Sequence, residues 1–158
     1  MKIDNIVTSV ETSNKLKSAG YLKKAIFSYF KDKNDKIYIS ETDFSLDKHF
    51  AFAYTSSELI ESLPSELEIS TETFVVNGMN YTNITDEEIE KYGSASLEML
   101  KITSDEDNQY MTKYSIGGRM IAFNRNLKGQ FKNLIRFGSN EAESRAEMIL
   151  ALIEDEKL

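Results

Sequence analysis

The chain has 158 residues, of which 41% are apolar and 28% charged, and its net charge is −7. This composition is typical of one globular domain with a continuous core, and it is too apolar for a disordered chain. Because cysteine is absent, disulfides, thiolate metal sites and cysteine nucleophiles are excluded, and the acidic balance disfavours general binding to nucleic acid or anionic membranes.

The sequence predicts a single domain over residues 1–158. One proline and seven glycines leave no stretch that resembles a flexible linker. The N-terminal residues lack the apolar segment of a signal peptide, and no apolar run approaches the ~20 residues of a membrane span. We therefore expect a cytoplasmic protein that does not contact a membrane.

The first predicted elements are a helix and a β-hairpin. Thr8 and Glu11 have the spacing of a capping box and Gly20 suits a left-handed C-cap, so we expect a helix over residues 9–19. An aromatic stretch, a polar loop and a short apolar stretch predict a hairpin over residues 25–39. The aromatic residues of this region and the next strand are expected in the core: Phe27, Tyr29, Phe30, Tyr38, Phe50, Phe52 and Tyr54.

A short strand and a second helix come next. The alternation over Phe50–Tyr54 is typical of a strand, which follows a polar, irregular stretch over residues 40–49. Thr55 and Glu58 form a second capping box, so a short helix begins here and ends before Pro64.

A strand, a hairpin and an acidic helix are predicted in the middle of the chain. Leu67–Val76 predicts one strand, and Asn77-Gly78 is a strong signal for a type I′ turn into another. Thr85 and Glu88 form a third capping box, which predicts a short helix that ends near Gly93.

The C-terminal part predicts an antiparallel meander that is closed by a long helix. Residues 95–103 fit either a strand or a helix, and residues 104–108 are a polar turn. Three strand-like runs then cover Tyr110–Ile116, Arg119–Asn124 and Gln130–Phe137. Cap spacing and helical periodicity predict a helix of about four turns, marked by Asn140, Ala142, Glu143, Ala146, Ile149, Leu150 and Ile153.

Strands that run together, with helices near the ends of the chain, indicate an α+β fold. We expect an antiparallel sheet made of hairpins and a C-terminal meander. The long C-terminal helix and two or three short helices pack on this sheet.

Positive charge is concentrated in one part of the chain. Residues 108–140 contain six basic and no acidic side chains, and such segregation indicates a binding surface. The candidate ligand-binding residues are Lys113, Arg119, Arg125, Lys128, Lys132 and Arg136.

The basic residues suggest three kinds of surface. Alternate strand residues share a face, so Arg119, Ile121, Phe123 and Arg125 are expected to face outward together. With Tyr110, Tyr114 or Phe123 nearby, such a face could hold phosphate and stack a base. It could equally bind a small phosphorylated ligand or an acidic partner, or be a plain solvated face that protects a sheet edge.

The sequence contains no clear catalytic constellation. His49 is the only histidine, so a histidine metal cluster is excluded and a Ser–His triad has no supporting motif. Gly117-Gly118-Arg119 lacks the lysine and hydroxyl of a phosphate loop, and Asp105-Glu106-Asp107 lacks EF-hand spacing. We expect no enzyme, no cofactor and no metal site.

Three segments in order, residues 8–20, 53–64 and 141–154, resemble small proteins encoded by bacteriophages and prophages of gut Bacteroidetes. In that group an N-terminal helix, a T-x-x-E-L helix ending in LP, and an E-A-x-x-R-A C-terminal helix bracket variable strands. The stretch over about residues 82–108 departs from the compact members and is expected to be an insertion. The resemblance implies no established activity and no catalytic residues.

These observations lead to three hypotheses. The first is a non-enzymatic phage accessory protein that binds a host or phage macromolecule, a protein above all. The second is a small nucleotide or nucleic-acid binder that uses the basic segment over residues 113–136. The third is a carboxylate-based hydrolase, because the 26 acidic residues offer many pairs and single out none. The oligomeric state stays open.

Overall fold

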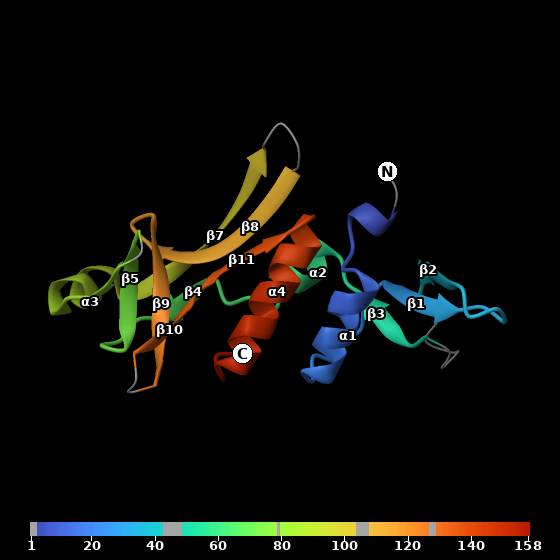
Figure 1. Cartoon of the computed structure of the whole chain (residues 1–158), viewed down its shortest axis with the longest axis horizontal. Coiled ribbons are helices and arrows are strands. Elements are labelled where there is room, and N and C mark those ends of the chain that lie inside the picture. Colours follow the sequence, from blue (N-terminus) through green and yellow to red (C-terminus); the bar gives the residue numbers. More distant parts are fainter. Residues whose placement is uncertain (1–2, 43–48, 79, 104–107, 127–128) are drawn as a thin grey trace.

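The computed structural model describes residues 3–42, 49–78, 80–103, 108–126 and 129–158, and it has the predicted α+β architecture (Figure 1). The helical elements are η1 (Ile3–Asn5), α1 (Val10–Ser18), α2 (Ser56–Ile60), α3 (Asp86–Tyr92) and α4 (Glu141–Glu154). The strands are β1 (Phe27–Lys31), β2 (Ile37–Glu41), β3 (Ala51–Ala53), β4 (Glu66–Glu68), β5 (Thr73–Asn77), β6 (Asn80–Asn83), β7 (Ser94–Thr103), β8 (Asn108–Ile116), β9 (Arg119–Asn126), β10 (Gln130–Asn133) and β11 (Ile135–Gly138).

The strands form two antiparallel sheets. The smaller sheet has the order β2-β1-β3, and the larger has the order β4-β7-β8-β9-β5-β6. In the larger sheet β9 pairs with β8 only at their shared turn, after which β10 pairs with β9 and β11 pairs with β8. The larger sheet therefore divides into two limbs, and Leu134 joins them, because its N–H donates to Ile121 O and its carbonyl accepts from Tyr114 N, each at 3.0 Å.

Two predicted single strands are each two strands in the structure. The prediction of one strand over Leu67–Val76 is wrong, because a turn in which Thr73 N donates to Ser70 O at 2.9 Å separates β4 from β5. The prediction over Gln130–Phe137 is wrong in the same way, since the chain changes partner at Leu134. Residues 95–103 are resolved as strand and belong to β7.

Local capping signals place two helices and misplace the start of a third. Thr55 and Thr85 both form the predicted capping boxes. The box predicted at Thr8 is wrong: Ser9 is the N-cap of α1 and its hydroxyl accepts from Thr12 N at 3.2 Å. Thr8 is instead buried, with its hydroxyl 2.8 Å from that of Ser13.

Helix α4 covers one face of the β7–β8–β11 limb and also contacts α1 and α2 (Figure 1). Its N-cap is Asn140, as predicted, which accepts from Glu143 N at 2.9 Å. The apolar face is buried through Ala142, Ala146, Met148, Ile149 and Leu152. No helix in the described ranges is long and apolar enough to cross a membrane.

The predicted aromatic core is confirmed in part. Tyr29, Phe30 and Tyr54 are buried, whereas Tyr38 is exposed and stacks on Phe30 with ring centroids 5.6 Å apart. The remaining members, Phe27, Phe50 and Phe52, are half-buried. The predicted insertion over residues 82–108 contains α3 and β7, and β7 pairs with β8 along most of its length; the idea of an insertion stays a prediction.

Candidate functional site

The predicted basic residues do not form one exposed cationic face in the described part of the chain. Lys113 on β8 is buried, and its ammonium lies 2.9 Å from Glu98 Oε2 on β7. Arg119 at the start of β9 pairs with Glu88 of α3. Both cations are therefore neutralised by a carboxylate of the same chain, at separate places in the fold.

Lys132 on β10 is a structural cation at the C-terminal end of α4. It is buried, and its ammonium lies 2.8 Å from Ala151 O, 2.7 Å from Glu154 Oε2 and 3.2 Å from Asp155 Oδ1. A cation placed here binds the last carbonyls of the helix and complements its dipole. The charge of Lys132 is therefore paired with groups of its own chain.

The remaining basic residues, Arg125, Lys128 and Arg136, do not form a phosphate site in the described part of the chain. Arg136 is half-buried, and its Nη1 donates to Asn133 O at 2.7 Å and to Ile135 O at 2.6 Å. The side chain of Arg125 and the whole of Lys128 lie outside the described residues, as do residues 104–107.

The strand face expected to point outward around Arg119 is mostly internal. Ile121 and Phe123 are both buried, so the prediction that they share an exposed face is wrong. The aromatic Tyr114 is also buried, and its hydroxyl donates to Pro64 O at 2.6 Å. Neither Tyr114 nor Phe123 is therefore available to stack on a base.

An exposed apolar surface lies elsewhere, on the face of the β7–β8–β11 limb that points away from α4. Strand register places Leu100, Met111 and Phe137 side by side in one row across the three strands. Thr112, on the opposite face, lies 3.0 Å from Ser144 of α4, so the row faces away from this helix. We call this face the ribbon surface, and its apolar members are Leu100, Ile102, Met111, Ile135 and Phe137.

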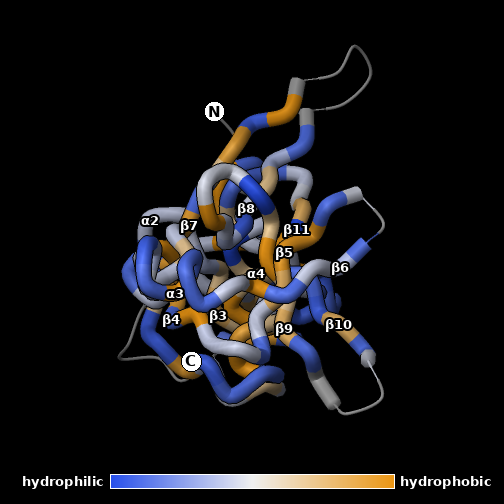
Figure 2. The backbone as a smooth tube through the Cα atoms, turned by 90° about the vertical axis from the view of Figure 1, so that its left-hand side faces the viewer, coloured by the Kyte–Doolittle hydropathy of each residue, from blue (hydrophilic) through white to orange (hydrophobic). Residues whose placement is uncertain are grey.

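The ribbon surface is exposed on its two flanking strands, β7 and β11, whereas Met111 between them is half-buried. Leu100 is 46% exposed, Ile102 39% and Phe137 48%. Figure 2 shows hydrophobic segments along the projecting β7–β8 ribbon rather than only in the interior. Large apolar side chains that gather on a surface in this way mark sites of interaction more often than scattered ones do.

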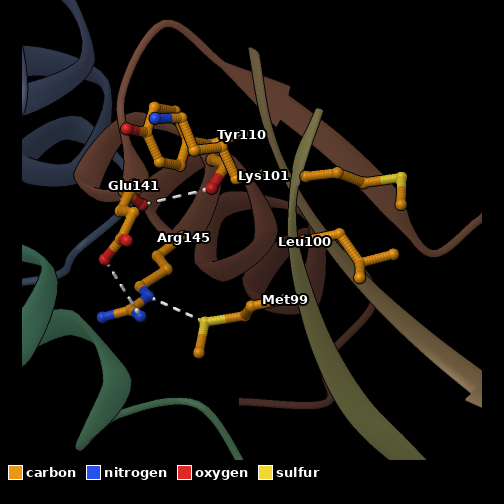
Figure 3. Close-up of a pocket in the computed structure, with 8 residues that line it drawn as sticks. Met99, Leu100, Lys101, Tyr110, Glu141 and Arg145 are labelled. Carbon is orange, nitrogen blue, oxygen red and sulfur yellow. Dashed lines mark hydrogen bonds and ion pairs between the residues drawn. The ribbon is translucent and has the colours of Figure 1, made fainter. Parts of the chain in front are cut away.

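A pocket of about 200 Å³ lies on the other face of the same ribbon, between β7, β8 and the first turns of α4 (Figure 3). Met99, Lys101 and Tyr110 point toward α4, whereas Leu100 points away. The buried Arg145 lines the pocket and donates to Ser56 O at 2.5 Å and to Met99 Sδ at 2.9 Å. Burial lowers the pKa of Arg145, and Glu141 at 3.5 Å raises it in part.

A second pocket, of about 150 Å³, contains His49. The imidazole ring lies 4.5 Å from the Phe52 ring, and its Nδ1 is buried without a hydrogen-bond partner in the described part. Lys17 at the same pocket donates to Phe50 O at 2.8 Å. The described residues include no group of three or more His, Cys, Asp or Glu side chains that could hold a metal ion.

The ion pair on the ribbon makes stability depend on pH. The Ser115 hydroxyl and then Lys113 lower the pKa of Glu98, so its carboxylate stabilises the fold above its unfolded pKa of about 4.3. This contribution is lost as the pH falls through the lower, folded value. Between about pH 7 and about pH 3, the free energy of unfolding should fall more steeply in wild type than in Glu98→Gln, by about 0.5–1 kcal/mol.

Urea unfolding at several pH values measures this difference. The control is Glu68→Gln, which removes an exposed carboxylate from β4. Parallel pH curves for wild type and Glu98→Gln would contradict the assignment.

Sequence reasoning missed the ribbon surface. Over residues 97–102 apolar side chains occur on both faces of β7, so the alternation that marks a half-exposed strand is absent. The consecutive Met99 and Leu100 were the available signal, because one of two such neighbours in a strand has to leave the α4 side. Comparison with known proteins adds no homologue: the chain matches no protein-family model, no curated protein and no solved structure.

Proposed function

We propose that the protein is a non-catalytic binding module that docks another protein through the ribbon surface. The observation that carries this proposal is the row of Leu100, Met111 and Phe137, with Ile102 beside it, on a sheet face that no described element covers. The resemblance to phage-encoded proteins predicts a host or phage factor as the partner. It also predicts a cytoplasmic location in the host cell, and both stay predictions.

A protein partner fits the surface better than a nucleic acid does. Binding to phosphate requires cations that are free to exchange counterions. Lys113, Arg119 and Lys132 are each within 4.0 Å of a carboxylate of their own chain. The large side chains exposed on the ribbon surface are aliphatic or aromatic, with the polar, exposed Gln109 beside Ile102. Large apolar side chains of this kind are typical of the buried centre of protein–protein interfaces.

The test compares two variants that place charge on exposed apolar side chains. Leu100→Asp/Phe137→Asp places two charges on the ribbon surface, and Leu22→Asp places one charge at a side chain that is 68% exposed elsewhere. We expect the double variant to lose its partner, with affinity lower by at least about 30-fold, because central apolar contacts dominate interface energies. The Leu22→Asp variant should bind like wild type.

The measurement is quantitative recovery of proteins from bacterial host lysate on immobilised wild type and variants. Circular dichroism first establishes that all three fold alike. Recovery of no protein at low and moderate salt, or equal recovery on all three, would contradict the proposed function.

A further inference from the structure

The outer edge of β7 is open beyond Leu97. Strand β4 pairs with β7 only at residues 94–96, and one further hydrogen bond runs from Leu97 N to Ser65 O at 2.9 Å. Within the described ranges, no other strand pairs with this side of β7. The larger sheet therefore has an unpaired edge from Glu98 to Ile102, where β4 has ended.

The hydrogen bond of Leu97 determines which backbone groups face outward. In an antiparallel strand the N–H and C=O of one residue point to the same side, and those of the next residue point to the other. The backbone N–H and C=O of Leu97 point toward β4. Those of Met99 and Lys101 therefore also point away from β8, toward the open edge. The bond from Tyr114 N to Leu134 O gives the same phase independently, since it turns the even residues of β8 toward β11 and the odd ones toward β7.

The exposed backbone groups lie between two different side-chain environments. Met99 and Lys101 point toward α4 and the pocket beside Arg145 (Figure 3). Leu100 and Ile102 lie on the ribbon surface, on the other side of the strand. A strand added at this edge would alternate between the two environments from one residue to the next.

We propose that the β7 edge receives one extended segment of the partner protein as an added antiparallel strand. This inference rests on the proposed function and specifies its binding mode. Every strand pair described in the protein is antiparallel, and the added segment would continue the line that β4 begins. Its N–H and C=O groups would bond those of Met99 and Lys101, as in other complexes formed by strand addition.

The side chains around the edge specify the chemistry of the segment. Lys101 is exposed, lies 5.7 Å from the Tyr110 ring, and forms no ion pair with a described carboxylate. The residue opposite Lys101 is therefore Asp or Glu, since opposite charges favour cross-strand pairs. Its two neighbours lie opposite Leu100 and Ile102 and are apolar, so the segment has the pattern apolar–acidic–apolar.

A second copy of the chain fits this edge less well. When two identical antiparallel strands pair about a two-fold axis, facing residues share a sheet face, so both are odd-numbered or both even-numbered. Within β7, Lys101 would then face Met99, Thr103 or another Lys101, because Leu97 is already bonded to Ser65. None of these supplies a carboxylate, and two facing lysines repel each other.

The probe is a displayed library of random peptides of about 12 residues, selected against the full chain. We expect enrichment of the apolar–acidic–apolar pattern. The enriched peptide is then synthesised with its backbone nitrogen methylated either at the acidic residue or at a neighbour. Methylation at the acidic residue removes a bond to the Lys101 carbonyl and should weaken binding about tenfold, whereas methylation at the neighbour should have little effect.

Variants of the protein test the same edge. Lys101→Pro removes an outward N–H and keeps the bonds to β8, so it should fold and lose the peptide. The Lys101→Glu variant should lose peptide binding because its charge is reversed, and the Leu22→Asp variant should bind the peptide like wild type. No enriched peptide, equal effects of the two methylations, or binding that survives Lys101→Pro would each overturn the inference.

Two further outcomes separate this inference from the proposed function. Loss of the lysate partner with Leu100→Asp/Phe137→Asp but not with Lys101→Pro would overturn strand addition and leave the proposed function standing. Sedimentation could also show that the wild-type chain is a dimer and that Lys101→Pro is a monomer. This result would mean that a second copy of the chain binds the β7 edge, and it would overturn the inference of a different partner protein.

Discussion

Replacing Lys132 with methionine is expected to lower the free energy of unfolding by about 3 kcal/mol, because it removes one partner of a buried ion pair. Methionine keeps most of the volume and none of the charge. The Asp155 side chain, 9% exposed, loses the ammonium at 3.2 Å, and Ala151 O loses one of two donors, the ammonium at 2.8 Å, while it keeps the Asp155 N–H at 3.2 Å. Both groups then remain buried with a polar partner missing, and this is the source of the cost.

The matched control for this substitution is Lys36→Met, at an exposed lysine in the loop between β1 and β2. It should change stability by less than about 0.5 kcal/mol. Adding Asp155→Asn to Lys132→Met removes the carboxylate charge that has lost the ammonium, and it should restore part of the lost stability. Urea unfolding provides the measurement, and equal stability of Lys132→Met and Lys36→Met would show that Lys132 is not a structural cation.

Structural features that depend only on residues close together in the sequence could be predicted. The capping boxes at Thr55 and Thr85 lie within four residues of their partners, and both are present. The start of α1 was misplaced by one residue because its cap has a distant contributor. The Glu143 carboxylate of α4 accepts from Ser9 N and from the Thr12 hydroxyl, the latter at 2.6 Å, and no local pattern contains such a contact.

Strand partners could not be predicted in the same way. A run of β-forming residues indicates an extended chain, but it does not say which strand lies beside it. Leu134 shows the consequence, since the chain pairs with β9 before it and with β8 after it while staying extended. The hairpin between β5 and β6 was predictable because its two strands are adjacent in the sequence. The predicted type I′ turn centred on Asn77-Gly78 is wrong by one residue, because Asn77 has negative φ and still pairs with Asn80 as part of β5.

The prediction of the binding site failed for the same reason, because it depends on contacts between residues that are distant in the sequence. The concentration of six basic residues is a real feature of the sequence, but carboxylates that are distant in sequence, such as Glu154, occupy several of them. The ribbon surface is the side of β7, β8 and β11 that none of the described elements covers, and sequence periodicity does not report which face of a sheet a helix will cover. Charge segregation in this sequence therefore reflects internal ion pairing, and the exposed apolar row is the better candidate for a binding site.

The largest effect of a single methyl group is expected at Gly138, where alanine should lower the free energy of unfolding by about 3 kcal/mol. A Cβ at this position would lie 2.6 Å from Glu143 Cβ and 2.8 Å from Glu143 C, and closer still to Ser144 N. These are mostly backbone atoms in the first turns of α4, so rotation of a side chain cannot relieve the clash. The turn is also held by the Asn140 cap and by Thr12, through Glu143.

The strain of Gly138→Ala should be relieved by separation of β11 from α4, and this links stability to function. Gly138 follows Phe137 of the ribbon surface and pairs with Tyr110 of β8. We therefore expect weaker partner binding together with the lower stability, both measured against Ser139→Ala, an exposed neighbour that should match wild type. If Gly138→Ala unfolds at the same urea concentration as Ser139→Ala, the close packing of β11 on α4 is wrong. The arrangement of Phe137 beside Met111 would then lose its support.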